Sequence, residues 1–346
     1  MRTSRELLVI LALGCIIAFV VWLLLPAPGL TKGKSKLTRS ATSDSKTDAV
    51  SASRRAPEPV ALNRGPEVLD GFRGDVHPLL HGRTELEVTA HWTKVGEGRD
   101  KLQTHVSPEV YAWFTQLEPA RPRQTYTERD FSAFLPLSAG EVGQLWSLDL
   151  DNIAELLKQF HPHPLMHLVA SGRRAGPDGA FAILRAVSPR YLDIVFRIHA
   201  EFYLTPSEGR YKDVDAWYSP AYFSGRVLIN KNTGKVDHFR LALPTDKMLN
   251  VHLTVDGSRI GFIPQPHDVV RVERMELIGG DAKLLNHISW QKALSPSEAD
   301  ARLAKVFYKS LEIDWTPFDR VLKQARSRNR PIFALVSWGA IDDQSC

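Results

Sequence analysis

The chain has only two cysteines, Cys15 and Cys346, and the second is its last residue. A cysteine thiolate is a nucleophile and a redox-active group, so the chemistry that Cys346 offers is thiol–disulfide exchange. Cys15 lies inside an apolar run, where a thiol behaves as a small hydrophobic side chain. Two isolated cysteines predict neither a disulfide framework nor a zinc site built from CxxC pairs.

Histidines and one carboxylate provide the other candidate groups. His161, His163 and His167 lie close together in sequence, but intervening prolines break the helical spacing that would direct them to one metal ion, so we expect no metal site. His199 and Glu201 share one face of a predicted strand and have the chemistry of an acid–base pair. The alternative that we favour for this pair is an ordinary surface pair on a sheet.

Recognised nucleotide, hydrolase and calcium motifs are missing from the sequence. There is no GxGxxG, Walker A, GxSxG or HExxH pattern. Asp149-Leu150-Asp151 matches the start of an EF-hand calcium loop, but Ala154 stands where the glycine must be and no glutamate closes the loop. We therefore expect no bound calcium and no cofactor-binding residues.

Hydrophobic periodicity predicts a mixed α+β domain over residues 70–309. Helices are expected to begin near Ser107, Asp151 and Ser295, because each is a capping residue followed by apolar side chains at helical spacing. Residues 179–278 alternate between apolar and polar side chains, most clearly over 194–204, as is typical of antiparallel strands with one buried face. The sheet should therefore be mostly antiparallel, with a hairpin turn near Gly234.

The last forty residues contain a different pattern. Thr316-Pro317 should begin a helix that ends near Asn329, and the apolar run 332–338 should form a strand buried on both sides. A helix, a buried strand, a short loop and then a cysteine is how a thioredoxin-like domain begins. The alternative, a natural carboxyl terminus with an incidental cysteine, is equally compatible with this pattern.

Residues 7–25 are nineteen consecutive uncharged, mostly apolar residues. At about 1.5 Å per residue they span roughly 28 Å, close to the hydrocarbon thickness of a bilayer, so we expect a retained transmembrane anchor that contacts membrane lipid. Residues 1–6 form a short tail, and residues 26–69 are expected to be a basic, flexible linker. Lys/Arg residues after the span favour a cytoplasmic carboxyl side, although a long following domain weakens that rule.

The formal net charge of +5 comes from this amino-terminal part of the chain. Residues 31–65 contain eight Lys/Arg and three acidic residues, and the rest of the chain after residue 65 is close to neutral. Binding to a nucleic-acid backbone needs a basic face on the folded domain. We therefore expect no nucleic-acid partner.

Several segments resemble the selenoprotein N family. The terminal sequence DDQSC, preceded by WGA at 338–340, resembles the family's active-site approach, whose motif continues as Ser-Cys-selenocysteine-Gly. Family-like segments also occur, in order, at 160–162, 196–202, 217–221, 239–241, 249–251 and 261–265. The resemblance covers roughly residues 125–346.

The resemblance implies a membrane-anchored thiol/selenol oxidoreductase with Cys346 as the resolving thiol and Ser345 framing the start of the next helix. It implies that selenocysteine follows Cys346, that residues 310–346 are the truncated start of a thioredoxin-like domain, and that these 346 residues alone are redox-incompetent. A gene caller that reads UGA as a stop codon would end the product at Cys346. The vertebrate EF-hand is missing, so calcium sensing does not carry over.

The resemblance also bears on location and partners. Most of the chain should be extracytoplasmic, in the endoplasmic reticulum lumen or in the periplasm of a bacterium, with a protein disulfide or a membrane protein as its partner and a link to calcium handling. The competing hypothesis is a non-enzymatic, membrane-tethered binding module. The two differ in whether the complete polypeptide reduces a disulfide.

Overall fold

The fold was analysed in a computed structural model of the chain. It describes residues 79–81, 83–96, 106–136, 140–168, 179–204, 214–247, 249–257 and 267–334. The predicted span 7–25, the predicted linker 26–69 and the pair Ser345-Cys346 lie outside these ranges. None of the helices that the structure describes has the length and apolar composition needed to cross a bilayer.

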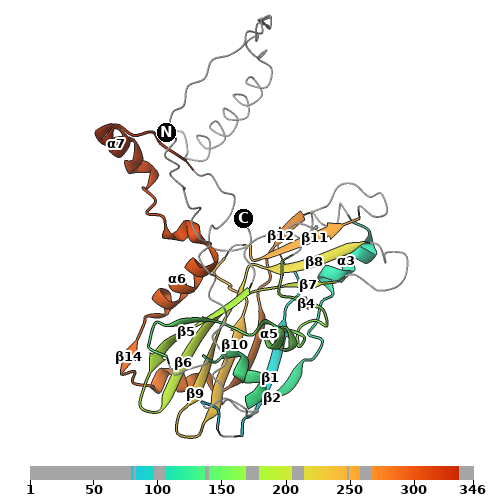
Figure 1. Cartoon of the computed structure of the whole chain (residues 1–346). Coiled ribbons are helices and arrows are strands. Elements are labelled where there is room, and N and C mark those ends of the chain that lie inside the picture. The colour runs from blue at the N-terminus through green and yellow to red at the C-terminus, as the bar shows by residue number, and fades with distance from the viewer. Residues whose placement is uncertain are drawn as a thin grey trace, which may run out of the picture. The chain divides into compact units, whose positions relative to one another are not determined.

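Two antiparallel sheets form the framework of the described residues (Figure 1). The larger sheet has the order β14-β5-β6-β9-β10-β13-β1-β2, and β3 pairs with β5. Its strands are β1 (Glu85–Trp92), β2 (Arg123–Thr127), β3 (Leu145–Ser147), β5 (Gly179–Val187), β6 (Tyr191–His199), β9 (Phe223–Asn230), β10 (Lys235–Ala242), β13 (Met275–Gly280) and β14 (Lys292–Ala293). The predicted antiparallel α+β architecture is confirmed.

The smaller sheet has the order β12-β11-β8-β7-β4. Its strands are β4 (Pro164–Leu165), β7 (Glu201–Tyr203), β8 (Asp215–Pro220), β11 (Val251–Asp256) and β12 (His267–Val270). The two sheets share long strands, because β6 continues into β7 after Ala200, and β8 continues into β9 after Ala221 and Tyr222. The long alternating segment predicted at 194–204 is therefore one chain path that passes from one sheet to the other.

Short helices complete the described part of the chain. They are α3 (Pro108–Thr115), α4 (Glu128–Phe131), α5 (Leu150–Leu157), α6 (Pro296–Phe307) and α7 (Phe318–Arg328), with 3-10 turns η1 (Ser132–Phe134), η4 (Ala282–His287) and η5 (Lys309–Glu312). Ser107 and Ser295 cap α3 and α6 as predicted. The predicted cap of α5 was wrong by two residues, since Asp149 accepts the backbone N–H groups of Asp151 and Asn152.

The strand alternation divides β6 between two environments. Ile194, Phe196 and Ile198 point into the main hydrophobic core. The opposite face of β5 and β6 is covered by α6, where Ile183 and Val195 pack against apolar residues of the helix. Both faces of this strand are therefore buried, which a period-two pattern does not predict.

The carboxyl-terminal region departs from the predicted buried strand. Residues 331–334 belong to no strand, and Ile332 and Phe333 are exposed. No residue of α7 is buried either. The physical reason is that, within the described ranges, no neighbouring strand offers its backbone to residues 332–334, so nothing covers them there. Residues 335–338 of the predicted strand lie outside the described residues.

Candidate functional site

A row of polar side chains lies on the α6 side of the bent strand pair. Arg197, His199 and Glu201 alternate along β6 and β7 with core residues, so all three point to the same face. All three are buried. The expected surface pair of His199 and Glu201 was therefore wrong, because α6, which lies a hundred residues further along the chain, covers the β6 end of this face.

Arg197 and His199 contact each other directly. The Arg197 Nε donates a hydrogen bond to His199 Nε2 at 3.0 Å. A ring nitrogen that accepts a hydrogen bond is unprotonated, so the imidazole is neutral and its proton lies on Nδ1. Burial, together with the positive charge of Arg197, lowers the pKa of His199 well below its ordinary value.

Aromatic rings surround this pair. The guanidinium carbon of Arg197 lies 3.6 Å from the ring centroid of Tyr222, and 5.8 and 5.5 Å from the centroids of Phe307 and Tyr308. His199 stacks on Phe307 with a centroid distance of 4.1 Å. Cation–π contacts of this kind are strongest when they are desolvated, as here. They hold the last turn of α6 in place, at the point where the chain leaves the sheets for η5 and α7.

A second part of the row crosses three neighbouring strands. The Ser219 hydroxyl donates a hydrogen bond to Glu201 Oε2 at 3.0 Å, from β8 to β7. Ser219 is also the cross-strand partner of His252 on β11, so the three side chains lie on one face. A carboxylate, a hydroxyl and an imidazole on neighbouring strands have the chemistry to hold and transfer protons. Sequence patterns missed Ser219 and His252, since only the strand pairing brings them beside Glu201.

Three of the segments that carry the family resemblance meet at this place in the fold. Residues 196–202 span β6 and β7, residues 217–221 include the end of β8, and residues 249–251 lead into β11. Asn250 fixes the last of these, since its side chain donates to the carbonyls of Pro244 and Val272 and accepts the Val272 N–H. Residues 261–265 lie outside the described part.

The histidine cluster at 161–167 has a different role. His161 Nδ1 accepts the backbone N–H of His163, and the His161 ring packs edge-on against Phe202. Burial, together with the neighbouring His163, lowers the pKa of His161 to about 4. Among the residues that the structure describes, no three His, Cys, Asp or Glu side chains converge in a way that could hold a metal ion.

We expect the protein to lose stability as the pH falls below 6.5. His161 and His199 have lowered pKa values in the folded protein, so below pH 6.5 the unfolded chain binds more protons than the folded chain. Folding stability should therefore decrease between about pH 6.5 and pH 4 as the unfolded histidines become charged. The midpoint of urea unfolding, measured across this range, checks the expectation.

Two substitutions separate this cause from a general acid effect. His161→Gln should reduce the pH dependence of the midpoint, because it removes one neutral imidazole that the folded state requires. His287→Gln, at an exposed histidine on η4, should leave the pH dependence unchanged. An unfolding midpoint that is the same at pH 7 and pH 5 would contradict the explanation.

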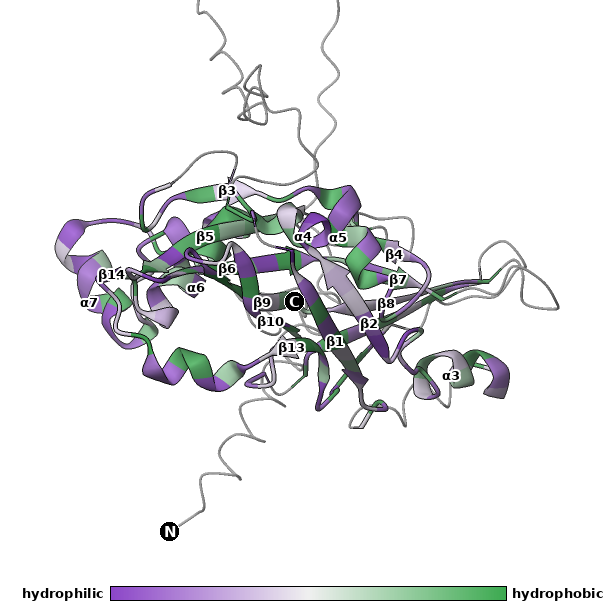
Figure 2. Cartoon of the chain, turned by 90° about the horizontal axis from the view of Figure 1, so that it is seen from below, coloured by the Kyte–Doolittle hydropathy of each residue, from purple (hydrophilic) through white to green (hydrophobic). Residues whose placement is uncertain are grey.

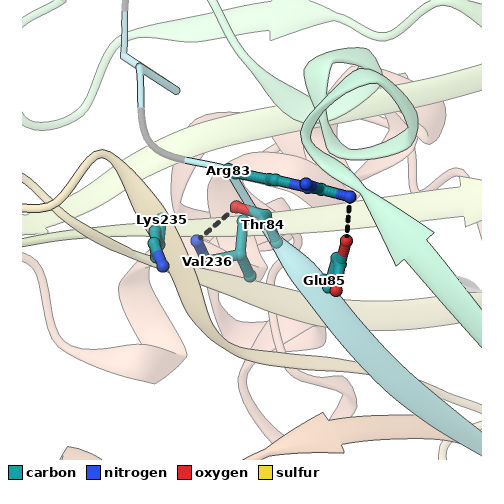
Figure 3. A pocket seen from close by; sticks show the side chains of 5 residues that line it. All are labelled: Arg83, Thr84, Glu85, Lys235 and Val236. Carbon is teal, nitrogen blue, oxygen red and sulfur yellow. Dashed lines mark hydrogen bonds and ion pairs between the residues drawn. The ribbon is translucent and has the colours of Figure 1, made fainter.

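One open pocket lies at the start of β1 and β10, lined by Arg83, Thr84, Glu85, Lys235 and Val236, with a volume of about 390 Å³ (Figure 3). Arg83 forms an ion pair with Glu85 at 2.6 Å, which neutralises much of its charge. The Thr84 hydroxyl accepts the Val236 N–H. No sequence motif predicts this pocket, and the side chains of Arg83, Thr84 and Glu85 already bond within it.

The structure thus defines a mixed α+β protein with two antiparallel sheets. Arg197, His199 and Glu201 form a buried polar row where β6 continues into β7, and α7 follows the sheets in the sequence. Selenoprotein N of Homo sapiens is 30% identical over 276 residues, with 66% of this chain and 45% of the relative covered. Selenoprotein N of Danio rerio is 32% identical over 320 residues, with 77% and 55% covered. The chain belongs to the selenoprotein N family.

The comparisons also set the extent of this relationship. The chain spans about half the length of the curated relatives that it matches. Selenoprotein N of Mus musculus is 29% identical, with 66% of this chain and 48% of the relative covered. No family model matches the chain, and no solved structure matches it.

Proposed function

We propose that the protein is a membrane-tethered thiol/selenol oxidoreductase of the selenoprotein N type. The observation that carries this proposal is the terminal Ser345-Cys346 pair, in a family-like approach sequence, within a chain that belongs to this family. Residues 7–25 would be the anchor, residues 310–346 the opening of a thioredoxin-like unit, and selenocysteine the next residue after Cys346. The sheet domain would lie on the extracytoplasmic side, where a redox activity could act on membrane proteins of calcium handling.

In this proposal Cys346 is the resolving residue. Its neighbour supplies a selenolate that attacks one sulfur of a substrate disulfide, and the other sulfur leaves as a thiolate that takes up a proton. The Cys346 thiolate then forms a bond to the selenium and releases the first substrate sulfur as a second thiol. Two electrons pass from the Cys–Sec pair to the substrate, and an external dithiol must reduce the pair again.

Two features of the described structure support this proposal: the position of α7 and the contacts that fix the end of α6. Helix α7 lies where the sequence predicts the helix of the thioredoxin-like opening, and its left-handed cap at Asn329 (φ 47°) turns the chain back after the helix. The contacts of Arg197 and His199 with Phe307 and Tyr308 fix the last turn of α6 before that extension. Beyond Tyr308 no described residue is buried.

The test is Cys346→Ser in the full-length selenium-containing protein. Turnover with a small disulfide substrate and a dithiol reductant should fall by at least about tenfold, since the mixed intermediate then resolves only by attack of the external thiol. Lys235→Glu, at an exposed position of β10, serves as the control, because it leaves Ser345, Cys346 and the residue after them unchanged. Undiminished turnover of Cys346→Ser would remove Cys346 from the mechanism.

A non-enzymatic binding module is the second candidate. The observation that favours it is the exposed apolar surface of α7, where Phe318 is 85% exposed. An exposed apolar cluster on a soluble domain commonly marks an interaction site. Full-length protein that contains selenium but reduces no disulfide would favour this candidate over the enzyme.

A further inference from the structure

A groove lies between α7 and the segment that follows it. Two adjoining cavities, of about 210 and 510 Å³, border the last two turns of the helix and residues 330–332. Ala325, Arg330, Pro331 and Ile332 line both of them, so the two cavities adjoin along this segment. It begins beside Trp315, whose indole N–H donates to the Ser310 carbonyl and is thereby held in place.

The lining of this groove combines apolar and polar side chains. Trp315, Val321, Ala325, Ile332 and Phe333 provide its apolar part, and Asp314, Thr316 and Gln324 lie beside them. Phe333 is 81% exposed and Ile332 is 44% exposed. Contact of this apolar surface with water costs free energy unless a partner covers it.

The apolar surface continues along the same side of the helix toward its amino end. Phe318 and Leu322, one helical turn apart, are 85% and 55% exposed. Figure 2 shows hydrophobic and hydrophilic residues interleaved along α7, as expected for an amphipathic helix whose apolar face has no partner in the described structure.

The rim of the groove is positively charged. Five cations lie between residues 314 and 333, against the two carboxylates of Asp314 and Asp319, and Asp314 lines one of the cavities. Arg326, Arg328 and Arg330 border the cavities themselves, and none of these three forms an ion pair within the described ranges. Apolar side chains beside a border with a net positive charge favour a ligand that is both apolar and acidic.

We propose that this groove binds an extended segment of the protein substrate that combines apolar and acidic residues. The inference rests on the proposed oxidoreductase function and names the partner of that same site, since only eleven residues of sequence lie between Phe333 and Ser345. A bound segment would hold its disulfide close to Cys346, and proximity raises the rate of exchange without new chemistry at the sulfur. The two other candidate surfaces are less suitable, because the Arg197 row is buried and the Arg83 pocket is polar.

The experiment measures binding and needs no redox turnover. A fluorescein-labelled synthetic peptide that alternates leucine with glutamate is titrated with the 346-residue chain in neutral-lipid nanodiscs, and fluorescence anisotropy gives Kd. A matched peptide with lysine in place of glutamate should bind at least about tenfold more weakly, and raising the salt concentration should weaken the glutamate peptide, because the rim charges are exposed.

Variants locate the binding surface. Arg326→Glu combined with Arg330→Glu, and separately Phe333→Ser, should each raise Kd for the glutamate peptide at least about tenfold. These side chains are exposed, so the variants should keep the circular dichroism spectrum and urea midpoint of the parent. Lys235→Glu reverses a charge at an exposed position of β10 and should leave Kd unchanged.

Three results with the 346-residue chain would overturn the proposal. These are no binding of the glutamate peptide, equal binding of both peptides, or binding of anionic-lipid vesicles through α7 with no peptide binding. If the peptide binds to the 346-residue chain but not to the full-length protein, the remaining polypeptide occupies the groove and the proposal also fails. Each result is a binding measurement, so failure of this proposal is distinguishable from failure of the Cys346→Ser test.

Discussion

Replacing Asp193 with alanine is expected to destabilise the folded protein by about 3–5 kcal/mol. The Asp193 carboxylate is fully buried between two arginines on the α6 side of the large sheet. It contacts Arg185 Nε through one oxygen and lies 3.0 Å from Arg226 Nε through the other. Removing the carboxylate leaves the buried guanidinium of Arg185 without its counter-ion, which is costlier than the loss of the pair itself.

The guanidinium of Arg185 is held in the interior by further contacts and cannot readily become solvated. Its Nη1 donates to the Leu294 carbonyl at 3.0 Å, and its guanidinium lies 5.0 Å from the ring centroid of Trp290. These contacts connect β5 to the segment that leads into α6.

Urea unfolding of Asp193→Ala checks the expectation. The matched control is Glu298→Ala, which removes an exposed pair with Arg302 on α6 and should cost less than about 1 kcal/mol. Equal unfolding midpoints for Asp193→Ala and the parent would show that the buried pair contributes nothing.

Gly225→Ala is expected to cost about 3 kcal/mol, at the upper end of what overpacking costs in a core. Gly225 is the cross-strand partner of Phe196 on β6. An added methyl group would lie 2.2 Å from the Arg240 carbonyl oxygen and 2.2 Å from Cζ of the Phe196 ring. The carbonyl belongs to the neighbouring strand and cannot rotate away, so the sheet itself must shift.

The same substitution at Gly96 provides the control. A methyl group there would meet only the Arg271 carbonyl oxygen at 3.5 Å, an ordinary contact. Gly96→Ala should therefore change the free energy of unfolding by less than about 0.5 kcal/mol. A Gly225→Ala protein that unfolds at the same urea concentration as Gly96→Ala would mean that the packing of Phe196 against this strand is looser than the distances indicate.

Local signals in the sequence predicted most of the fold. The alternation over 194–204 identified β6 and β7, and Ser107 and Ser295 identified the starts of α3 and α6, because capping and strand alternation depend on near neighbours in sequence. The error at Asp151 has the same local origin, since Asp149 and Asp151 are both capping residues and only the backbone conformation distinguishes them.

The buried polar row required information that is distant in sequence. The alternation placed Arg197, His199 and Glu201 on one face, but it did not reveal that α6 would cover that face. Ser219 and His252 join the row only through the pairing of β7, β8 and β11. Contacts between residues so far apart depend on the whole topology, so a window of neighbouring residues does not contain them.

The resemblance to the selenoprotein N family, first seen in short segments, is confirmed by the relatives of known identity. Three expectations stay predictions: the redox roles of Ser345 and Cys346, the anchor at 7–25 and the thioredoxin-like opening. The first two concern residues outside the described ranges. The third requires a strand that residues 331–334 do not form. The redox prediction rests on the chemistry of a thiol beside a selenol, which burial and packing elsewhere in the chain do not determine.

The proposed redox role is tested most directly by the nucleotides that follow the Cys346 codon in the messenger RNA. We expect UGA there, followed by an open reading frame that begins with a glycine codon and accompanied by a selenocysteine-insertion hairpin. UAA or UAG at that position, or UGA with no reading frame beyond it, would contradict the selenol mechanism and leave the anchored binding module as the better explanation.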